Sequence, residues 1–160
     1  MIDATDLKIL NILQQNARTS NAQIARELGM APSAILERIR KLEERGVIRG
    51  YEARIDPEAL GLSLLAYVFV RSDEAPGEAR VGELLTRIPE VQEVHHIAGE
   101  DCFLVKMRTA DARSLGRLLR EGIGVTGSVR TRTTIVLESL RETARLPLPA
   151  PAEEVLHGAA

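Results

Sequence analysis

The sequence predicts an α+β protein in two parts, the first helical and the second built of strands that alternate with helices. Residues 1–55 carry apolar side chains at helical spacing, separated by residues that begin or end helices. Residues 62–146 contain six apolar segments in the order strand, helix, strand, strand, helix, strand. Residues 56–61 hold a proline and a glycine and form the expected linker. Residues 147–160 contain three prolines without apolar periodicity, which predicts a flexible tail.

Composition excludes several classes of protein. The 21 basic and 23 acidic side chains nearly cancel, so contact with a polyanion requires a local basic surface. A hydrophobic content of 44% excludes a wholly disordered chain. The longest apolar run, Leu64–Val70, is far shorter than the roughly 20 residues of a membrane span, and the first residues do not resemble a signal peptide. We therefore expect a cytoplasmic protein with no membrane partner.

Few side chains are suited to cofactor or single-strand chemistry. Cys102 is the single cysteine, which excludes a disulfide framework and a metal site made of several cysteines. Two tyrosines, two phenylalanines and no tryptophan provide no platform on which the bases of a single strand could stack. We expect no cofactor, no metal site and no catalytic residue.

The first two helices have recognisable beginnings. Asp3 is suited to cap a first helix, which carries leucines at three-residue steps. Ser20 and Gln23 fit a capping box that opens a short second helix. Gly29 ends this helix, because glycine readily adopts the left-handed conformation that follows a helix.

A third helix and an extended segment follow. Pro32 is tolerated in the first turn of this helix, which ends at Gly46. Its apolar stripe predicts one buried face, made of Ile35, Ile39 and Leu42. Residues 47–55 read as extended, which predicts a wing after the third helix.

The spacing of three residues indicates a helix-turn-helix. Two helices that cross steeply need a small residue at their contact, and Ala25 provides one. The tight turn needs a positive φ angle, which Gly29 can adopt. Ile35 supplies the aliphatic side chain that packs against the preceding helix. An ordinary three-helix bundle without a binding function remains the alternative.

The exposed face of the third helix predicts contact with double-stranded DNA. If this helix enters the major groove, we expect Ser33, Ala34 and Glu37 to face base edges. Arg38, Arg40 and Lys41 would then bind phosphates. Residues 31–54 contain six basic and four acidic side chains, a modest excess that a solvated helix could also show.

The second part predicts a ferredoxin-like βαββαβ domain. The order of its segments gives an antiparallel sheet with both helices on one face. The expected elements are the strands Leu62–Val70, Val91–Ala98, Cys102–Arg108 and Ser128–Leu137 and the helices Gly77–Ile88 and Ala112–Glu121.

Both faces of this sheet carry apolar side chains. In the first strand, Leu65, Tyr67 and Phe69 alternate with further apolar residues on the opposite face. Leu104 likewise lies opposite its apolar neighbours in the third strand. Since two helices cover one face only, the second face must be buried elsewhere, most economically against another copy of the chain. The sequence therefore predicts a homodimer, which would also pair two DNA-binding units.

Two features of this part have ordinary explanations on pattern alone. Residues 99–101 could form a plain hairpin turn with acidic side chains in solvent. The threonine-rich run 130–134 suits any β-strand.

Taken together, the residues resemble a known family. Residues 3–51 with the linker 56–61 resemble the N-terminal winged domain of the Lrp/AsnC regulators, the leucine-responsive and asparagine-responsive transcription factors of bacteria and archaea. Residues 94–106 and 131–137 resemble their effector-binding domain. The similarity extends from Ile2 to about residue 145.

This resemblance implies a transcription factor that forms dimers or larger assemblies and binds a small effector, commonly an amino acid, at subunit interfaces. The glycine-acid turn at the effector site maps onto Gly99, Glu100 and Asp101, and Thr133 and Thr134 would contribute from a neighbouring subunit. The chain departs from the family at two places, Ala31 in place of a capping serine and Glu37 in place of a basic or polar residue.

Two other functions compete with this interpretation. Some proteins of this architecture act on tetrapyrroles through histidines, and His95, His96 and Cys102 lie close in the sequence. Adjacent histidines of a strand point to opposite faces, however, so only one of them can join Cys102. The second alternative is an assembly module that does not bind DNA. The acidic Glu37 and the small excess of basic residues favour this alternative.

Overall fold

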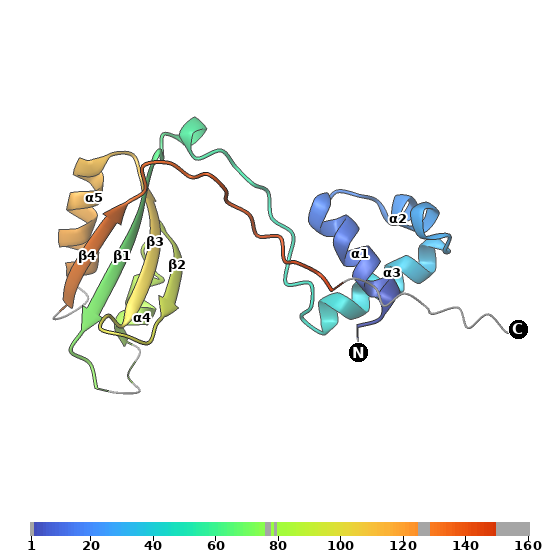
Figure 1. Ribbon diagram of the computed structural model, residues 1–160, viewed down its shortest axis with the longest axis horizontal. Coiled ribbons are helices and arrows are strands. Elements are labelled where there is room, and N and C mark those ends of the chain that lie inside the picture. The colour runs from blue at the N-terminus through green and yellow to red at the C-terminus, as the bar shows by residue number, and fades with distance from the viewer. Residues whose placement is uncertain (1, 76–77, 79, 125–128, 150–160) are drawn as a thin grey trace, which may run out of the picture. The chain divides into compact units, whose positions relative to one another are not determined.

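The computed structural model describes residues 2–75, 78, 80–124 and 129–149 (Figure 1). The chain divides into two compact units. The first unit consists of Met1–Arg54 together with the chain from Thr143 onward. The second unit consists of Ile55–Glu142. The domain boundaries expected from the sequence stay predictions, and most of the expected tail lies outside the described residues. None of the helices in the described segments has the length and apolar character that a membrane span needs.

The helices of the first unit begin as their capping residues predict. They are α1 (Ala4–Gln15), α2 (Asn21–Leu28) and α3 (Pro32–Glu44). Asp3 and Asp6 form a reciprocal capping box at α1, and Ser20 and Gln23 form another at α2. Ala31, at the start of α3, provides no side-chain cap.

The predicted packing of the helix-turn-helix is confirmed. Gly29 ends α2 in the left-handed conformation with a φ angle of 65°. Ala25 and Ile35 are buried together in one apolar core with Ile9 and Ile24. This core fixes α3 against α2 and leaves the opposite face of α3 in solvent.

The segment expected to form the wing follows α3 without regular secondary structure over most of its length. Residues 47–55 carry no strand, because no described segment of this chain pairs with them. The segment is instead held to α3 by a hydrogen bond in which the Tyr51 hydroxyl donates to Glu43 over 2.9 Å. Burial, and then the Glu43 carboxylate, raises the pKa of Tyr51 to about 12.

The second unit has the predicted ferredoxin-like topology. In the described residues, one antiparallel sheet has the strand order β2-β3-β1-β4. The elements after the short helical turn Glu58–Leu60 are β1 (Leu64–Ser72), α4 (Arg80–Leu85), β2 (Val91–His96), β3 (Phe103–Thr109), α5 (Ala112–Leu118), the π-helical turn η2 (Leu119–Ile123) and β4 (Val129–Ile135).

Several bounds differ from the expected ones. Strand β1 begins two residues later than predicted and runs on to Ser72, because its pairing with β4 extends that far. The helix expected from Gly77 is described from Arg80, and Gly77 and Ser128 lie outside the described residues. The last part of the expected second helix is the π-helical turn η2.

One face of the sheet packs against both helices (Figure 1). Val68 of β1 is paired with Val105 of β3, and both are fully buried. Val81 and Leu85 of α4 and Leu115 of α5 belong to the same apolar core.

The opposite face, which we call the outer face, is apolar at its centre and charged at one end. Tyr67, Phe69 and Leu104 are half-buried there, as the alternation in the sequence predicts. Leu65, also on this face, is only 6% exposed within a single chain. One end of this face is therefore buried within a single chain, and burial of the rest against another copy stays a prediction.

The chain returning from β4 crosses this end of the outer face. Glu142 binds Lys106 and, over 2.9 Å, Arg108, both of β3. The segment then runs to α1, where the Gln14 side chain forms two hydrogen bonds with the backbone of Leu146, at 2.7 and 3.3 Å. The expected tail, residues 147–160, therefore follows directly after Leu146, which is hydrogen-bonded to α1 of the first unit.

The packing of α4 on the sheet has a direct test. A Cβ atom on Gly82 would lie 2.7 Å from the ring of Phe103, whereas one on Gly116 of α5 meets only a flexible arginine at 3.5 Å. We expect Gly82→Ala to destabilise the second unit by about 2 kcal/mol through overpacking. Gly116→Ala, the matched control, should be neutral or stabilising. Urea unfolding of the full chain measures both, and equal stability of the two variants would contradict this packing.

Candidate DNA-binding and effector sites

The third helix presents the predicted DNA-binding face to solvent. Ser33, Arg40 and Lys41 are exposed, and Ala34 and Glu37 are half-buried. The buried stripe of the same helix anchors it in the core, so this face has a fixed direction. The geometry agrees with the outward face that the sequence predicts.

Arg38, predicted to bind phosphate, has partners inside the protein. Its guanidinium lies 2.7 Å from a carboxylate oxygen of Asp3 and 2.7 Å from one of Asp6. Hydrogen bonds to these carboxylates raise the pKa of Arg38, and the Asp6 backbone amide together with Arg38 lowers the pKa of Asp3. Arg38 therefore ties α3 to the first turn of α1, and we interpret it as a positioning residue.

The other two cations of α3 are paired along the helix. Arg40 lies between Glu37, at 2.9 Å, and Glu44, at 3.0 Å. Lys41 lies 3.4 Å from the same Glu37 carboxylate. The Arg40 guanidinium, followed by Lys41, lowers the pKa of Glu37, so this carboxylate is ionised at neutral pH.

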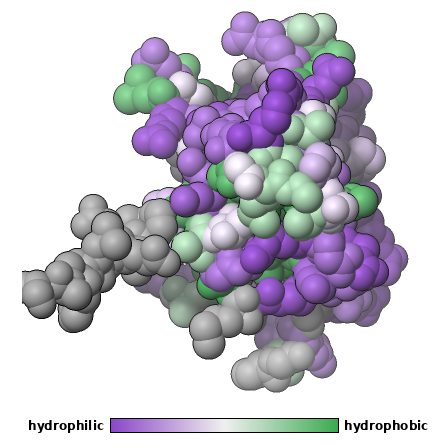
Figure 2. Space-filling model, turned by 90° about the vertical axis from the view of Figure 1, so that its right-hand side faces the viewer, coloured by the Kyte–Doolittle hydropathy of each residue, from purple (hydrophilic) through white to green (hydrophobic). Residues whose placement is uncertain are grey.

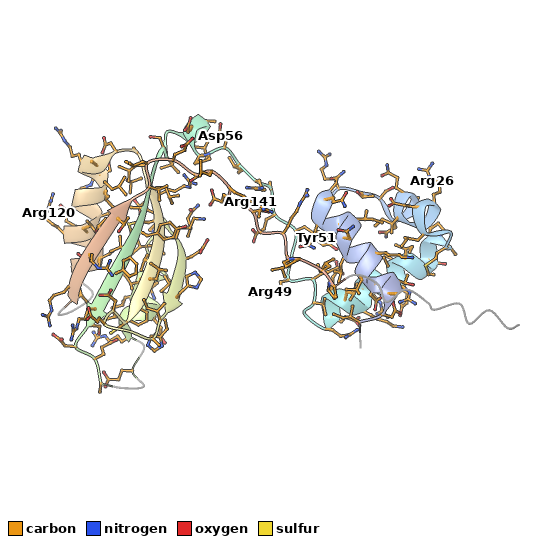
Figure 3. All side chains as sticks on the ribbon, in the orientation of Figure 1. Arg26, Arg49, Tyr51, Asp56, Arg120 and Arg141 are labelled. Atoms are coloured by element: carbon orange, nitrogen blue, oxygen red, sulfur yellow. The ribbon has the colours of Figure 1, made fainter. Side chains whose placement is uncertain are left out.

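Sequence reasoning did not single out Leu36 of α3, nor Arg49 and Tyr51 of the segment that follows it. Leu36 of α3 is 56% exposed and lines a groove together with Glu37, Arg40 and Tyr51. Arg49 and Tyr51 lie on the segment after α3 (Figure 3). An exposed leucine inside an otherwise polar helix face was the available signal for Leu36.

On the face drawn in Figure 2, polar residues surround a smaller apolar area.

The predicted effector turn lies against the outer face of the sheet. Asp101 accepts a hydrogen bond from Arg132 of β4 over 2.8 Å. The same guanidinium stacks over the ring of Phe69, 4.0 Å from its centroid. Gly99 has a φ angle of 152°, which favours glycine. Arg132 and Phe69 are functional candidates that the sequence did not single out, since their sequence separation hides the contact.

The two predicted threonines do not share a face. Thr133 pairs with Val68, which faces the helices, whereas Thr134 pairs with Tyr67 on the outer face. Because neighbouring residues of a strand alternate, one ligand on the outer face can meet only Thr134 of this pair. Asp101 and Arg132 are therefore in contact on the outer face, whereas Thr133 lies on the opposite face of the sheet.

A charged cluster occupies the end of the outer face near β2. Lys106, whose side chain is 11% exposed, binds Glu142 and, at 3.2 Å, Glu93. Burial lowers the pKa of Lys106, but the hydrogen bonds to these carboxylates outweigh burial and raise it. His95 lowers the pKa of Glu93 through a 3.0 Å contact, and Lys106 adds to this effect. Every charge of the cluster has a partner, so it is a structural network.

The two histidines lie on opposite faces of the sheet. His95 is paired with Leu104 on the outer face, and His96 is paired with Phe103 on the opposite face. Cys102 contacts the backbone of Ser72. Within the described segments, no group of three or more His, Cys, Asp or Glu side chains could hold a metal ion.

Comparison with protein families matches both units. Residues 2–49 match the model described as winged helix-turn-helix DNA-binding. Residues 65–146, about half of the chain, match the Lrp/AsnC ligand binding domain. The chain belongs to the Lrp/AsnC family of transcriptional regulators.

Individual relatives agree with this assignment. The transcriptional regulator FL11 of Pyrococcus horikoshii is 40% identical over 147 residues, which cover 92% of this chain and 97% of FL11. The feast or famine regulatory protein of M. tuberculosis, solved with L-methionine, superposes with a TM-score of 0.87 at 35% identity, covering 93% of this chain and all of that chain. A transcriptional regulator of Neisseria meningitidis, also in complex with L-methionine, gives 0.85 at 27% identity, covering 92% and 97%. The protein is accordingly a regulator with a helix-turn-helix and a ligand-binding domain.

The tie between α1 and α3 can be tested by removing its cation. Arg38→Ala removes the cation that binds the Asp6 carboxylate, which is 6% exposed and keeps its hydrogen bond from the Asp3 backbone amide. We expect a loss of about 2 kcal/mol from the stability of the first unit. Arg26→Ala on the exposed side of α2 is the control and should change stability little.

The pH dependence of the same variant checks the cause. The folded-state pKa of Asp3 lies below 3.8, so its ion pair stabilises the fold above that pH and is lost as pH falls through the lower value. The difference in unfolding free energy between Arg38→Ala and the unmodified protein should therefore be largest at neutral pH and shrink below about pH 4. A difference that does not vary with pH would contradict the ion pair.

Proposed function

We propose that this regulator binds specific double-stranded DNA through α3 and that an amino acid bound by the second unit controls its activity or assembly. The observation that carries the proposal is the fixed, solvent-exposed face of α3 in a helix-turn-helix whose core residues Ala25 and Ile35 are buried. In this proposal the regulator acts in the cytoplasm, where the DNA of bacteria and archaea lies.

The groups on the exposed face of α3 fit distinct roles in the major groove. Ser33 and Glu37 can form hydrogen bonds with base edges, and a glutamate accepts from the amino group of cytosine. Leu36 is suited to contact a thymine methyl group. Arg40 and Lys41, with Arg49 after the helix, supply the phosphate contacts. Ala34 lies close enough to the helix start to permit close approach of the backbone.

DNA binding is tested by a salt titration. Phosphate contacts release counterions, so the logarithm of the binding constant should fall linearly with the logarithm of salt concentration, with a slope of about −0.9 per contact. Fluorescence anisotropy with a duplex enriched by in vitro selection measures this slope. Absence of binding at low salt by a folded protein would support an assembly module in place of a DNA-binding regulator.

The effector proposal rests on the charge pair beside the glycine turn. An amino acid carries a carboxylate, which needs donors, and an ammonium group, which needs an acceptor. Arg132 and Asp101 provide these opposite charges, and the backbone of the turn at Gly99 and Glu100 adds further polar groups. Two relatives were solved with L-methionine, which supports an amino acid as the ligand class. Thr134 faces the same side of the sheet.

The effector site is tested by thermal shift with the twenty amino acids. A ligand at 100 times its dissociation constant stabilises the folded state by about 2.7 kcal/mol. Asp101→Asn should abolish the response to the amino acid that stabilises the unmodified protein, because the acceptor for its ammonium group is weakened. Glu121→Gln removes an exposed charge from η2 and should leave the response intact. A full response in Asp101→Asn would exclude this turn as the site.

We also propose that the outer face forms a homodimer. Tyr67, Phe69 and Leu104 are only half-buried in a single chain, so a second copy can bury further apolar area there. A two-fold axis through this face would pair two helix-turn-helix units, as binding to two DNA half-sites requires.

The proposal includes no catalytic role. His95 and His96 point to opposite faces, and the Cys102 side chain packs against the apolar core with its thiol beside the backbone of Ser72. Absorbance and metal content of the purified protein test the tetrapyrrole- or metal-dependent alternative, which predicts a bound group.

A further inference from the structure

The third helix carries no net charge. Pro32–Glu44 contains three basic side chains, Arg38, Arg40 and Lys41, and three acidic ones, Glu37, Glu43 and Glu44. Each of the three cations lies within ion-pair distance of at least one carboxylate of the protein itself. A DNA phosphate must therefore compete with internal carboxylates for these cations.

Glu37 is the carboxylate that engages the two exposed cations together. Its Oε1 atom lies 2.9 Å from one terminal nitrogen of Arg40, and its Oε2 atom accepts from Arg40 Nε over 3.1 Å. This two-point contact has the fork geometry with which a guanidinium binds a phosphate. Lys41 Nζ approaches the same Oε1 atom at 3.4 Å.

The ion pairs of Glu37 with Arg40 and Lys41 contribute little to the stability of the fold. The side chains of Glu37, Arg40 and Lys41 are 46%, 57% and 61% exposed. Exposed pairs on a helix add little to stability, because water screens them and ordering long side chains costs entropy. Arg38 differs, since it binds the buried Asp6 and serves the fold.

We propose that Glu37 is a specificity-determining residue that limits binding to non-specific DNA by holding Arg40 and Lys41 in phosphate-like contacts. The inference rests on the proposed function, DNA binding through α3. On a non-specific duplex, the phosphates alone must displace Glu37, and its own charge opposes their approach. On the correct site, base contacts along α3 offset this cost. The acidic residue thereby raises the ratio of specific to non-specific affinity.

The test compares Glu37→Gln with the unmodified full chain on two duplexes, one enriched by in vitro selection and one of random sequence. Glu37→Gln frees Lys41 from its carboxylate partner and leaves Arg40 with Glu44 alone, which permits up to two further phosphate contacts. The salt slope on the random duplex should therefore steepen by about 0.9 to 1.8 units. Between 200 and 50 mM salt, the affinity of Glu37→Gln for the random duplex should therefore increase by about 3.5-fold to 12-fold more than that of the unmodified protein. The specificity ratio should fall.

Two further variants make the test quantitative. Glu44→Gln releases a contact to Arg40 alone, so its effect on the random duplex should be smaller than that of Glu37→Gln. Glu121→Gln, on η2 of the second unit, removes the same charge far along the chain and should change neither slope nor ratio. Circular dichroism confirms that each variant keeps its helices.

Each outcome decides the proposal. An unchanged random-duplex slope in Glu37→Gln, or an equal change in Glu121→Gln, overturns the inference and leaves DNA binding through α3 in place. Weaker binding of the selected duplex with unchanged binding of the random duplex also overturns the inference, because Glu37 would then act only through the base contact proposed above. If the folded, unmodified protein binds neither duplex at low salt, both the inference and the proposed function fail.

Discussion

The two apolar faces of the four-stranded sheet are the constraint on which the rest of the molecule depends. Helices α4 and α5 cover one face, and the charged cluster around Lys106 closes one end of the other. Tyr67, Phe69 and Leu104 remain half-buried at its centre. Covering this centre with a second chain would join two DNA-binding units and bring the effector turn, through Asp101, next to the subunit interface.

The DNA-binding unit shows how one helix divides its charges between folding and recognition. Arg38 faces two carboxylates of the α1 cap and secures the angle of α3. Arg40 and Lys41 lie farther out and share Glu37, a weak and exchangeable contact. In the proposed function, arginine thus serves the fold at position 38 and DNA at position 40. Helical periodicity decides which role each takes, because only some positions can reach the cap of α1.

Local signals in the sequence predicted most of the first unit. Capping residues and Gly29 act within a few residues, so the helix starts could be predicted without tertiary information. Strand alternation likewise predicted both faces of the sheet. The ion pair of Arg38 and the contact between Asp101 and Arg132 join residues about 31 to 35 positions apart, and no local pattern encodes such pairs. The winged helix-turn-helix was predicted correctly, and its extended segment after α3 pairs with no strand among the described residues.

The central claim is that the outer face holds two copies of the chain together. Sedimentation velocity of the full chain at low micromolar concentration and physiological salt measures this most directly. The structure of the sheet predicts a particle of at least twice the chain mass of 17.5 kDa, with no monomer at these concentrations. A stable species of single-chain mass would contradict the account, because the half-buried side chains of Tyr67, Phe69 and Leu104 would then need no partner.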